Sequence, residues 1–215
     1  MASDRVLFGA VASNNNNAVS QQVLAFTNAG GINPCIVGIA NIDGGAGQTV
    51  SSMTYGAANL SKVIAANDGT ARRVEIWQAT GGNIPTGANN LTANFGAATD
   101  VVLACLSFFG VDQANPARLA VSISGTSATP ALLVSPGFEG GMIVSSMCDG
   151  GVPTGQGANQ TQLWLNSTPA TLSSIGSRGT VPTHAAGNND TYTISTSSTF
   201  VICGCVIMPA PRRRA

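Results

Sequence analysis

Three stretches of the chain decide its fold: Val101–Phe109 (VVLACLSFF), Met142–Cys148 (MIVSSMC) and Phe200–Ile207 (FVICGCVI). Their β-branched and aromatic residues favour strands. A strand in a sheet with one wet face alternates apolar and polar residues, but these three are apolar at both parities. We therefore expect both faces of each strand to be covered. The sequence leaves open whether an arm or loop of the same chain or a neighbouring subunit covers them.

The pattern around these stretches also predicts strands. From residue 22 onward, short apolar or alternating runs are separated by clusters of Gly, Asn, Pro and Asp, and no stretch shows helical periodicity with cap signals. We predict an all-β fold, an antiparallel β-sandwich of jelly-roll-like type. Within it we expect Thr49–Tyr55 and Ser61–Ala65 to form a hairpin. We expect Arg72–Ala79 to follow the turn at Asn67–Gly69, and Asn90–Phe95 and Val101–Phe109 to be separate strands.

The two ends of the chain differ from the middle. Asn14–Asn17 is a run of four asparagines, a poor strand and a poor helix, so it predicts a loop or arm. Arg212–Arg214 is the one cluster of charge. We therefore divide the chain into an N-terminal arm (residues 1–21), a β-sandwich domain (residues 22–209) and a basic C-terminal tail (residues 210–215).

Composition excludes several classes of protein. Of 215 residues only 8% are charged, against about 25% in an ordinary soluble protein, and the net charge is zero. The high apolar content argues against disorder, and one lysine is too few to build a basic face for nucleic acid. The longest apolar stretch is interrupted by Ser107 and Gly110, so we expect no membrane span.

The cysteines and the N-terminus bear on the compartment. The N-terminus lacks the basic and apolar regions of a secretory signal. The number of cysteines is odd and each lies in an apolar run, which predicts buried free thiols rather than disulfides. We therefore expect folding in a reducing cytoplasm. The cysteines are Cys35, Cys105, Cys148, Cys203 and Cys205.

Residues for catalysis or metal binding are scarce. The one histidine, His184, lies in a loop by composition, and no G-x-S-x-G elbow is present. Calcium could be held by the Asp43-Gly44-Gly45 or Asp149-Gly150-Gly151 turns, but no D-x-D-x-D-G loop supports this. We therefore predict that the protein is not an enzyme and that it has no catalytic residue, no metal and no cofactor.

Two further residue types have alternative interpretations. Glu75 is next to Arg72 and Arg73 in sequence, which predicts an ion pair on a strand surface; Asp190, beside asparagine, predicts a turn. Trp77 and Trp164 are expected in the core. The alternative places them, or Tyr55, on an exposed face where they would stack on a sugar.

A resemblance extends over roughly residues 23–209. It is carried by Val50–Gly56 (VSSMTYG), Leu60–Val63 (LSKV), Val74–Trp77 (VEIW), Phe108–Gln113 (FFGVDQ) before Pro116, and the terminal strand Phe200–Met208 closed by Pro209. These segments resemble all-β domains of bacteriophage virion proteins and of some bacterial surface proteins. The resemblance implies a jelly-roll-like sandwich that serves as a structural or attachment module, without catalytic residues. The asparagine run and the arginine tail are not part of the pattern.

Together these features predict a phage structural protein of the capsid decoration (cement) type. We expect it to be made in the host cytoplasm, to reside in the virion and to bind across joints between subunits of the major capsid protein or other virion proteins. A homo-oligomer is expected, a trimer by preference, with no nucleic acid or membrane partner. The candidate interface residues are Val6, Leu7, Phe8, Arg212, Arg213 and Arg214; the tail could equally be solvated. The alternative is a tail-fibre or surface module that binds a carbohydrate or receptor.

Overall fold

The computed structural model describes residues 5–45, 47–134, 140–158, 160–168, 172–180 and 188–211. In this part of the chain every regular element is a β-strand, and all pairings are antiparallel. The predicted all-β, antiparallel, sandwich-like class is confirmed. Among the described residues no helix is long and apolar enough to cross a membrane.

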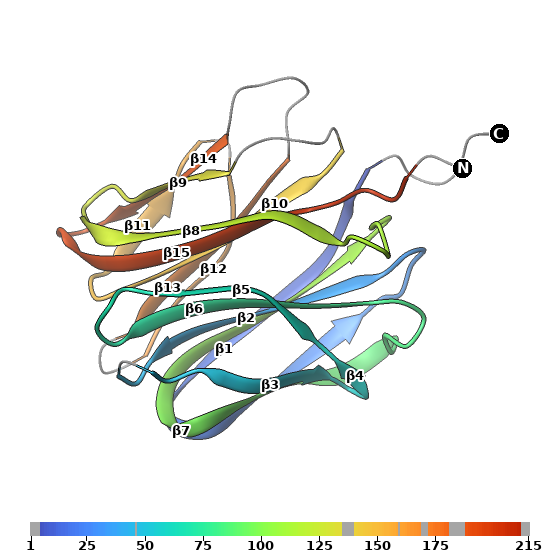
Figure 1. The fold of residues 1–215 in the computed structure, drawn as a ribbon, viewed down its shortest axis with the longest axis horizontal. Coiled ribbons are helices and arrows are strands. Elements are labelled where there is room, and N and C mark those ends of the chain that lie inside the picture. The colour runs from blue at the N-terminus through green and yellow to red at the C-terminus, as the bar shows by residue number, and fades with distance from the viewer. Residues whose placement is uncertain are drawn as a thin grey trace.

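The strands form three sheets (Figure 1). The largest has the order β4 (Ala58–Asn59), β3 (Val50–Tyr55), β7 (Gly87–Phe109), β2 (Cys35–Asp43), β6 (Arg72–Thr80) and β5 (Ser61–Asn67), and β1 (Leu7–Asn28) also pairs with β7. The second has the order β12 (Thr161–Ser167), β13 (Ser173–Thr180), β10 (Met142–Asp149), β15 (Ser198–Ile207) and β8 (Ala117–Ser127). The third has the order β11 (Pro153–Gln156), β14 (Asn188–Ile194) and β9 (Ala131–Val134).

The largest sheet is folded over on itself by its two longest strands. β1 and β7 pair along most of their length, and the register shifts around Asn16–Gln21, where four residues of β7 oppose a single residue of β1. Such extra residues bend a ribbon. Strand β3 pairs with the first half of β7, whereas β2 pairs with its second half. The bend is visible at the lower left of Figure 1 and turns one sheet into two layers.

The molecule is therefore a stack of four layers with three apolar cores. The first layer holds β3, β4 and the neighbouring halves of β7 and β1; the second holds their other halves with β2, β6 and β5. The five-stranded sheet is the third layer and the three-stranded sheet is the fourth. One buried cluster fills each interval, for example Met53 and Leu91 between the first two layers, Val144 and Leu106 between the central layers, and Met147 and Tyr192 between the last two.

This stacking explains the strands that are apolar at both parities. In β10 the side chain of Val144 lies in the central core, and its neighbour Ile143 lies in the core below the fourth layer. In β2 the same holds for Val37 and Ile36, which face opposite cores. The predicted cover on both faces is confirmed, and it comes from other layers of the same chain.

The asparagine run does not form the predicted loop. Asn14–Asn17 lies within β1, whose residues here pair with Val101–Leu103 of β7, so the boundary drawn at residue 21 falls inside a strand. Tertiary pairing overrides the weak strand propensity of asparagine. The amides also link the open edge of β1 to β12. Asn15 donates to the carbonyl of Ser167, and Asn166 donates to Ser13 Oγ at 2.9 Å.

Two strand pairings also differ from expectation. Val50–Tyr55 does not pair with Ser61–Asn67; it pairs with β7 and with the short β4, while β5 forms a hairpin with β6 across the predicted Asp68 turn. Asn90–Phe95 and Val101–Phe109 are parts of one strand, β7. The predicted hairpin partner was wrong because β3 turns back only into the short β4, and its longer partner, β7, is distant in sequence.

A glycine in the third layer tests the packing of the central core. The ring of Trp164 lies against Gly176, and a Cβ at Gly176 would lie 2.0 Å from a ring carbon of Trp164. We expect Gly176→Ala to lower the free energy of unfolding by about 1–3 kcal/mol, because the ring has to move within a packed core. Gly96→Ala in β7 is the control, since a Cβ there meets nothing within 4 Å. Equal thermal stability of the two variants would contradict this packing.

Candidate functional site

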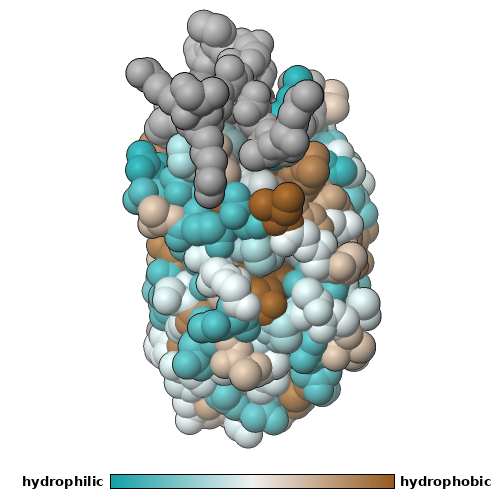
Figure 2. Space-filling view, turned by 90° about the vertical axis from the view of Figure 1, so that its right-hand side faces the viewer, coloured by the Kyte–Doolittle hydropathy of each residue, from teal (hydrophilic) through white to brown (hydrophobic). Residues whose placement is uncertain are grey.

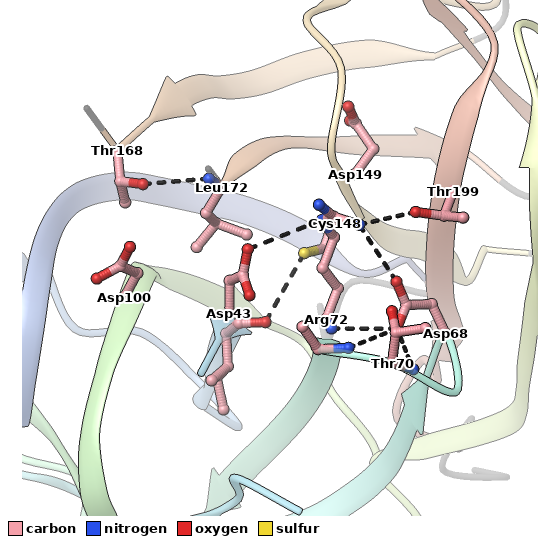
Figure 3. Close-up of polar contacts among 12 residues, drawn as sticks. Asp43, Asp68, Thr70, Arg72, Asp100, Cys148, Asp149, Thr168, Leu172 and Thr199 are labelled. Carbon is pink, nitrogen blue, oxygen red and sulfur yellow. Dashed lines mark hydrogen bonds and ion pairs between the residues drawn. The ribbon is translucent and has the colours of Figure 1, made fainter. Parts of the chain in front are cut away.

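The two turns that we considered and did not favour for calcium, at Asp43 and Asp149, lie at the same end of the two central layers, around Arg72 (Figure 3). Arg72 is on β6 in the second layer. Its Nη1 donates to Thr199 Oγ1 on β15 at 2.7 Å and to Asp68 Oδ2 at 3.4 Å, and its Nε lies 3.9 Å from Asp43 Oδ2. The arginine thus connects the hairpin and β2 in the second layer with β15 in the third.

Asp68 is held in the ionised form by its own turn. Its Oδ1 accepts hydrogen bonds from the backbone N–H groups of Thr70, Ala71 and Arg72 and from the Thr70 hydroxyl. Burial pushes the pKa of this carboxyl upward, but the Thr70 and Arg72 hydrogen bonds and the Arg72 charge outweigh it and lower the pKa. Asp68 is therefore a structural anion.

Asp149 is the opposite case. Its side chain is buried, Oδ1 accepts from the Gly151 N–H at 2.7 Å, and Oδ2 has no hydrogen-bond partner. Burial raises the pKa of the carboxyl to about 6, against the lowering effects of the Gly151 hydrogen bond and of the Arg72 charge. A Cβ at Gly150 would lie 2.5 Å from Arg72 Nη2, so glycine leaves room for the guanidinium.

This arrangement does not favour a calcium site. The Arg72 guanidinium occupies the position beside Asp43 and Asp68 where a cation would have to bind, and it already supplies the positive charge. In the part of the chain that the structure describes, no group of three or more His, Cys, Asp or Glu side chains is placed to hold a metal.

A second internal ion cluster surrounds Glu75. The predicted pairing with Arg73 is present, with Arg73 Nε 2.6 Å from Oε1, but the prediction of a surface pair was wrong because Glu75 is fully buried. Its Oε2 lies 2.9 Å from Lys62 Nζ and accepts from Trp77 Nε1 at 3.0 Å. Two cations and an indole N–H satisfy a carboxylate that would otherwise be costly to bury.

A third cluster lies between the third and fourth layers. Asp190 is on β14, not in the predicted turn, and it is buried. It accepts a hydrogen bond from Ser145, whose hydroxyl lies 2.6 Å from Tyr192 Oη, and Gln160 Nε2 donates to Ser177 Oγ at 2.6 Å. Burial raises the pKa of Asp190 to about 6, against the lowering effect of the Ser145 hydrogen bond.

The candidate interface residues have different fates. Val6 is buried in the central core, and Phe8 packs against that core with the Arg178 guanidinium 4.6 Å from its ring centroid. Only Leu7, 51% exposed, is open to a partner. Arg212, Arg213, Arg214 and His184 lie outside the described residues.

The aromatic residues and the cysteines are in the interior. Trp77, Trp164 and Tyr55 are buried, so they cannot provide the exposed stacking platform that the carbohydrate-binding alternative needed. All five cysteines are buried free thiols, as predicted, and burial raises the pKa of Cys205 to about 12. A thiol so far from its thiolate form is inert as a nucleophile.

Every acidic side chain in the described residues therefore has a partner within the chain. The pairs are Asp43 with Arg72, Asp68 with Thr70, Glu75 with Arg73 and Lys62, Asp100 with the Ala18 N–H, Asp112 with the Ala114 N–H, Asp149 with the Gly151 N–H, and Asp190 with Ser145.

Comparison of the chain with protein-family models, with curated proteins and with solved structures gave no match.

Sequence reasoning missed the burial of Glu75, Asp149 and Asp190, because the neighbours of a residue in sequence do not show which layer covers it.

The Arg72 cluster predicts a large effect of one substitution. Arg72→Met would leave Asp43, Asp68 and Asp149 without their shared cation. We expect a loss of about 3 kcal/mol in the free energy of unfolding, measured by urea denaturation at pH 7. Arg73→Met is the control, because Glu75 keeps Lys62 and Trp77, so its loss should be smaller. The opposite order would contradict the role assigned to Arg72.

The raised pKa of Asp190 predicts that the free energy of unfolding falls as the pH rises. The carboxyl has a pKa of about 6 in the folded chain and about 3.9 when unfolded. Between these values the folded state holds the extra proton, so this group lowers stability by about 2–3 kcal/mol from pH 4 to pH 7.

We expect Asp190→Asn to be more stable than the wild type at pH 7, because asparagine is uncharged and its carbonyl can still accept the Ser145 hydrogen bond. The fall in stability between pH 4 and pH 7 should be smaller in this variant, because residue 190 no longer titrates. Denaturation midpoints from pH 4 to pH 8 test this. Gly96→Ala, which removes no titratable group and whose Cβ meets nothing within 4 Å, is the control and should leave the slope unchanged. An unchanged slope in Asp190→Asn would contradict the assignment.

Proposed function

We propose that this protein is a non-catalytic structural protein of a phage virion, of the capsid decoration type. The observation that supports it best is the internal use of charge. The acidic side chains of the described residues hold turns and join layers, and among these residues no group of three His, Cys, Asp or Glu side chains is placed to hold a metal. We infer that the chain acts by binding and stabilising a partner rather than by catalysis through proton transfer.

The outer surface fits contact with a neutral partner. The face in Figure 2 is mostly polar, and its apolar areas are small and separate. The large apolar residues that are exposed are scattered over several strands and loops: Leu7, Val23, Ile32, Leu119, Ile123, Leu133, Val152 and Leu165. With few charges, recognition would depend on shape, hydrogen bonds and modest apolar contacts.

The expected trimer needs a different basis from the one that the sequence suggested. The strands that are apolar on both faces are covered within the chain, so they offer nothing to a neighbouring subunit. Strand β8 is the best remaining candidate among the described strands. It pairs only with β15, and it is exposed along most of its length, with Leu119 and Ile123 39% and 43% exposed. Burial of such residues contributes about 25 cal/mol per Å² before association costs.

The test is the location and copy number of the chain in its virion. We expect cryo-electron microscopy to show it on the head, in cyclic groups over the joints between capsid subunits. We also expect the purified chain to raise the temperature at which heads lacking it release their genome. Ile123→Lys should weaken self-association measured by light scattering, with Ser122→Lys as the control on the same strand. Density only at a tail fibre, or no binding to heads, would overturn the proposal.

A further inference from the structure

The outer face of the first layer carries a polar depression that the capsid role does not use. It has a volume of about 480 Å³ and is lined by Ala25 of β1, Gly56 of the β3–β4 turn, and Ala88, Asn89, Asn90 and Thr92 of β7. Four of these residues are exposed: Ala25, Gly56, Ala88 and Asn90. Three of its lining residues, Ala25, Gly56 and Ala88, are small and leave space beside the Asn and Thr side chains of β7.

The register of the three strands arranges this face in rows. In the first row Gln21, Asn94 and Ser52 are neighbours across β1, β7 and β3, and they bond to one another: Gln21 Nε2 donates to Asn94 Oδ1 at 2.7 Å, and Asn94 Nδ2 donates to Ser52 Oγ at 2.9 Å. Both ends of the Asn94 amide are engaged within this row, so its central residue has little to offer a ligand.

The next two rows are different. Thr92 lies between Val23 of β1 and Thr54 of β3, and Asn90 lies beside Ala25. Within the described chain no hydrogen bond engages the side chains of Thr92 or Asn90. Their hydroxyl and amide groups therefore face the depression with their hydrogen-bonding capacity unused, beside the apolar surface of Val23, which is 42% exposed.

We propose that this depression binds a neutral saccharide. None of its six lining residues is charged, so it lacks the cation that a phosphate, sulfate or sialic acid would require. Its free amide and hydroxyl groups match the donors and acceptors of sugar hydroxyls. Val23, Ala25 and Ala88 offer apolar contact to the C–H face of a sugar ring. An open depression without an aromatic platform binds each sugar weakly, so affinity comes from several copies acting together.

The experiment measures binding of the whole chain, clustered by an antibody, to an array of neutral and sialylated oligosaccharides. We expect binding to at least one neutral oligosaccharide and no preference for sialylated ones. Thr92→Val and Asn90→Leu remove the free polar groups with little change in volume, and the double variant should bind about tenfold less. Thr126→Val, at an exposed threonine of β8, is the matched control and should bind as the wild type does.

Two readouts keep the outcome clear. Melting temperatures of the variants show whether they fold, and chemical shifts of Thr92 and Val23 on addition of the array's best soluble oligosaccharide show where it binds. Preference for charged glycans, no neutral glycan bound, or equal binding by the double variant would overturn the proposal. None of these results depends on whether the chain binds heads, so failure here leaves the capsid role to its own test.

Discussion

The structure depends on the burial of two sheets on both of their faces. The second and third layers have an apolar core above and below, so strands such as β2 and β10 are largely apolar on both sides, and their few buried polar residues, such as Ser146 and Asn41, are hydrogen-bonded to one another. A sandwich of two sheets would need only one core. Four layers raise the ratio of buried to exposed residues in a chain of 215 residues, which is why so little charge and so much apolar sequence are compatible with a folded chain.

Internal charge follows from the same constraint. With cores on both sides, an acidic residue at a layer boundary has no water to solvate it, so it needs a cation, several N–H donors or a proton. The chain uses all three. Glu75 has Lys62 and Arg73, Asp68 has its turn, and Asp149 and Asp190 have pKa values raised to about 6, so they hold a proton below that pH. Because these carboxyls lie between layers, the contacts between layers are sensitive to pH. The outer surface carries few charges.

Much of the fold could be predicted from sequence, but not its assembly. The apolar pattern of Val101–Phe109 is a local property, and it correctly indicated a strand covered on both faces. What covers it is set by contacts between segments far apart in the chain, which local pattern does not encode. The same reason explains why Asn14–Asn17 was expected to be a loop: its strand exists because β7 runs beside it. Glu75 and Asp190 were misplaced because their neighbours in sequence suit a surface as well as a layer boundary.

The fold also limits how this chain can bind anything. Since its most apolar strands are enclosed, a partner meets the outer faces of the first and fourth layers or the open edges, where polar residues alternate with scattered apolar ones such as Val23, Ile123 and Leu133 and where charges are few. Binding through such a surface has little Coulombic contribution and should change little with ionic strength, whereas binding through the Arg212–Arg214 tail would weaken as salt screens it. Salt dependence therefore distinguishes two kinds of attachment. A contact made by the sheets depends on shape and persists as salt is added, whereas a contact made by the tail depends on charge and weakens.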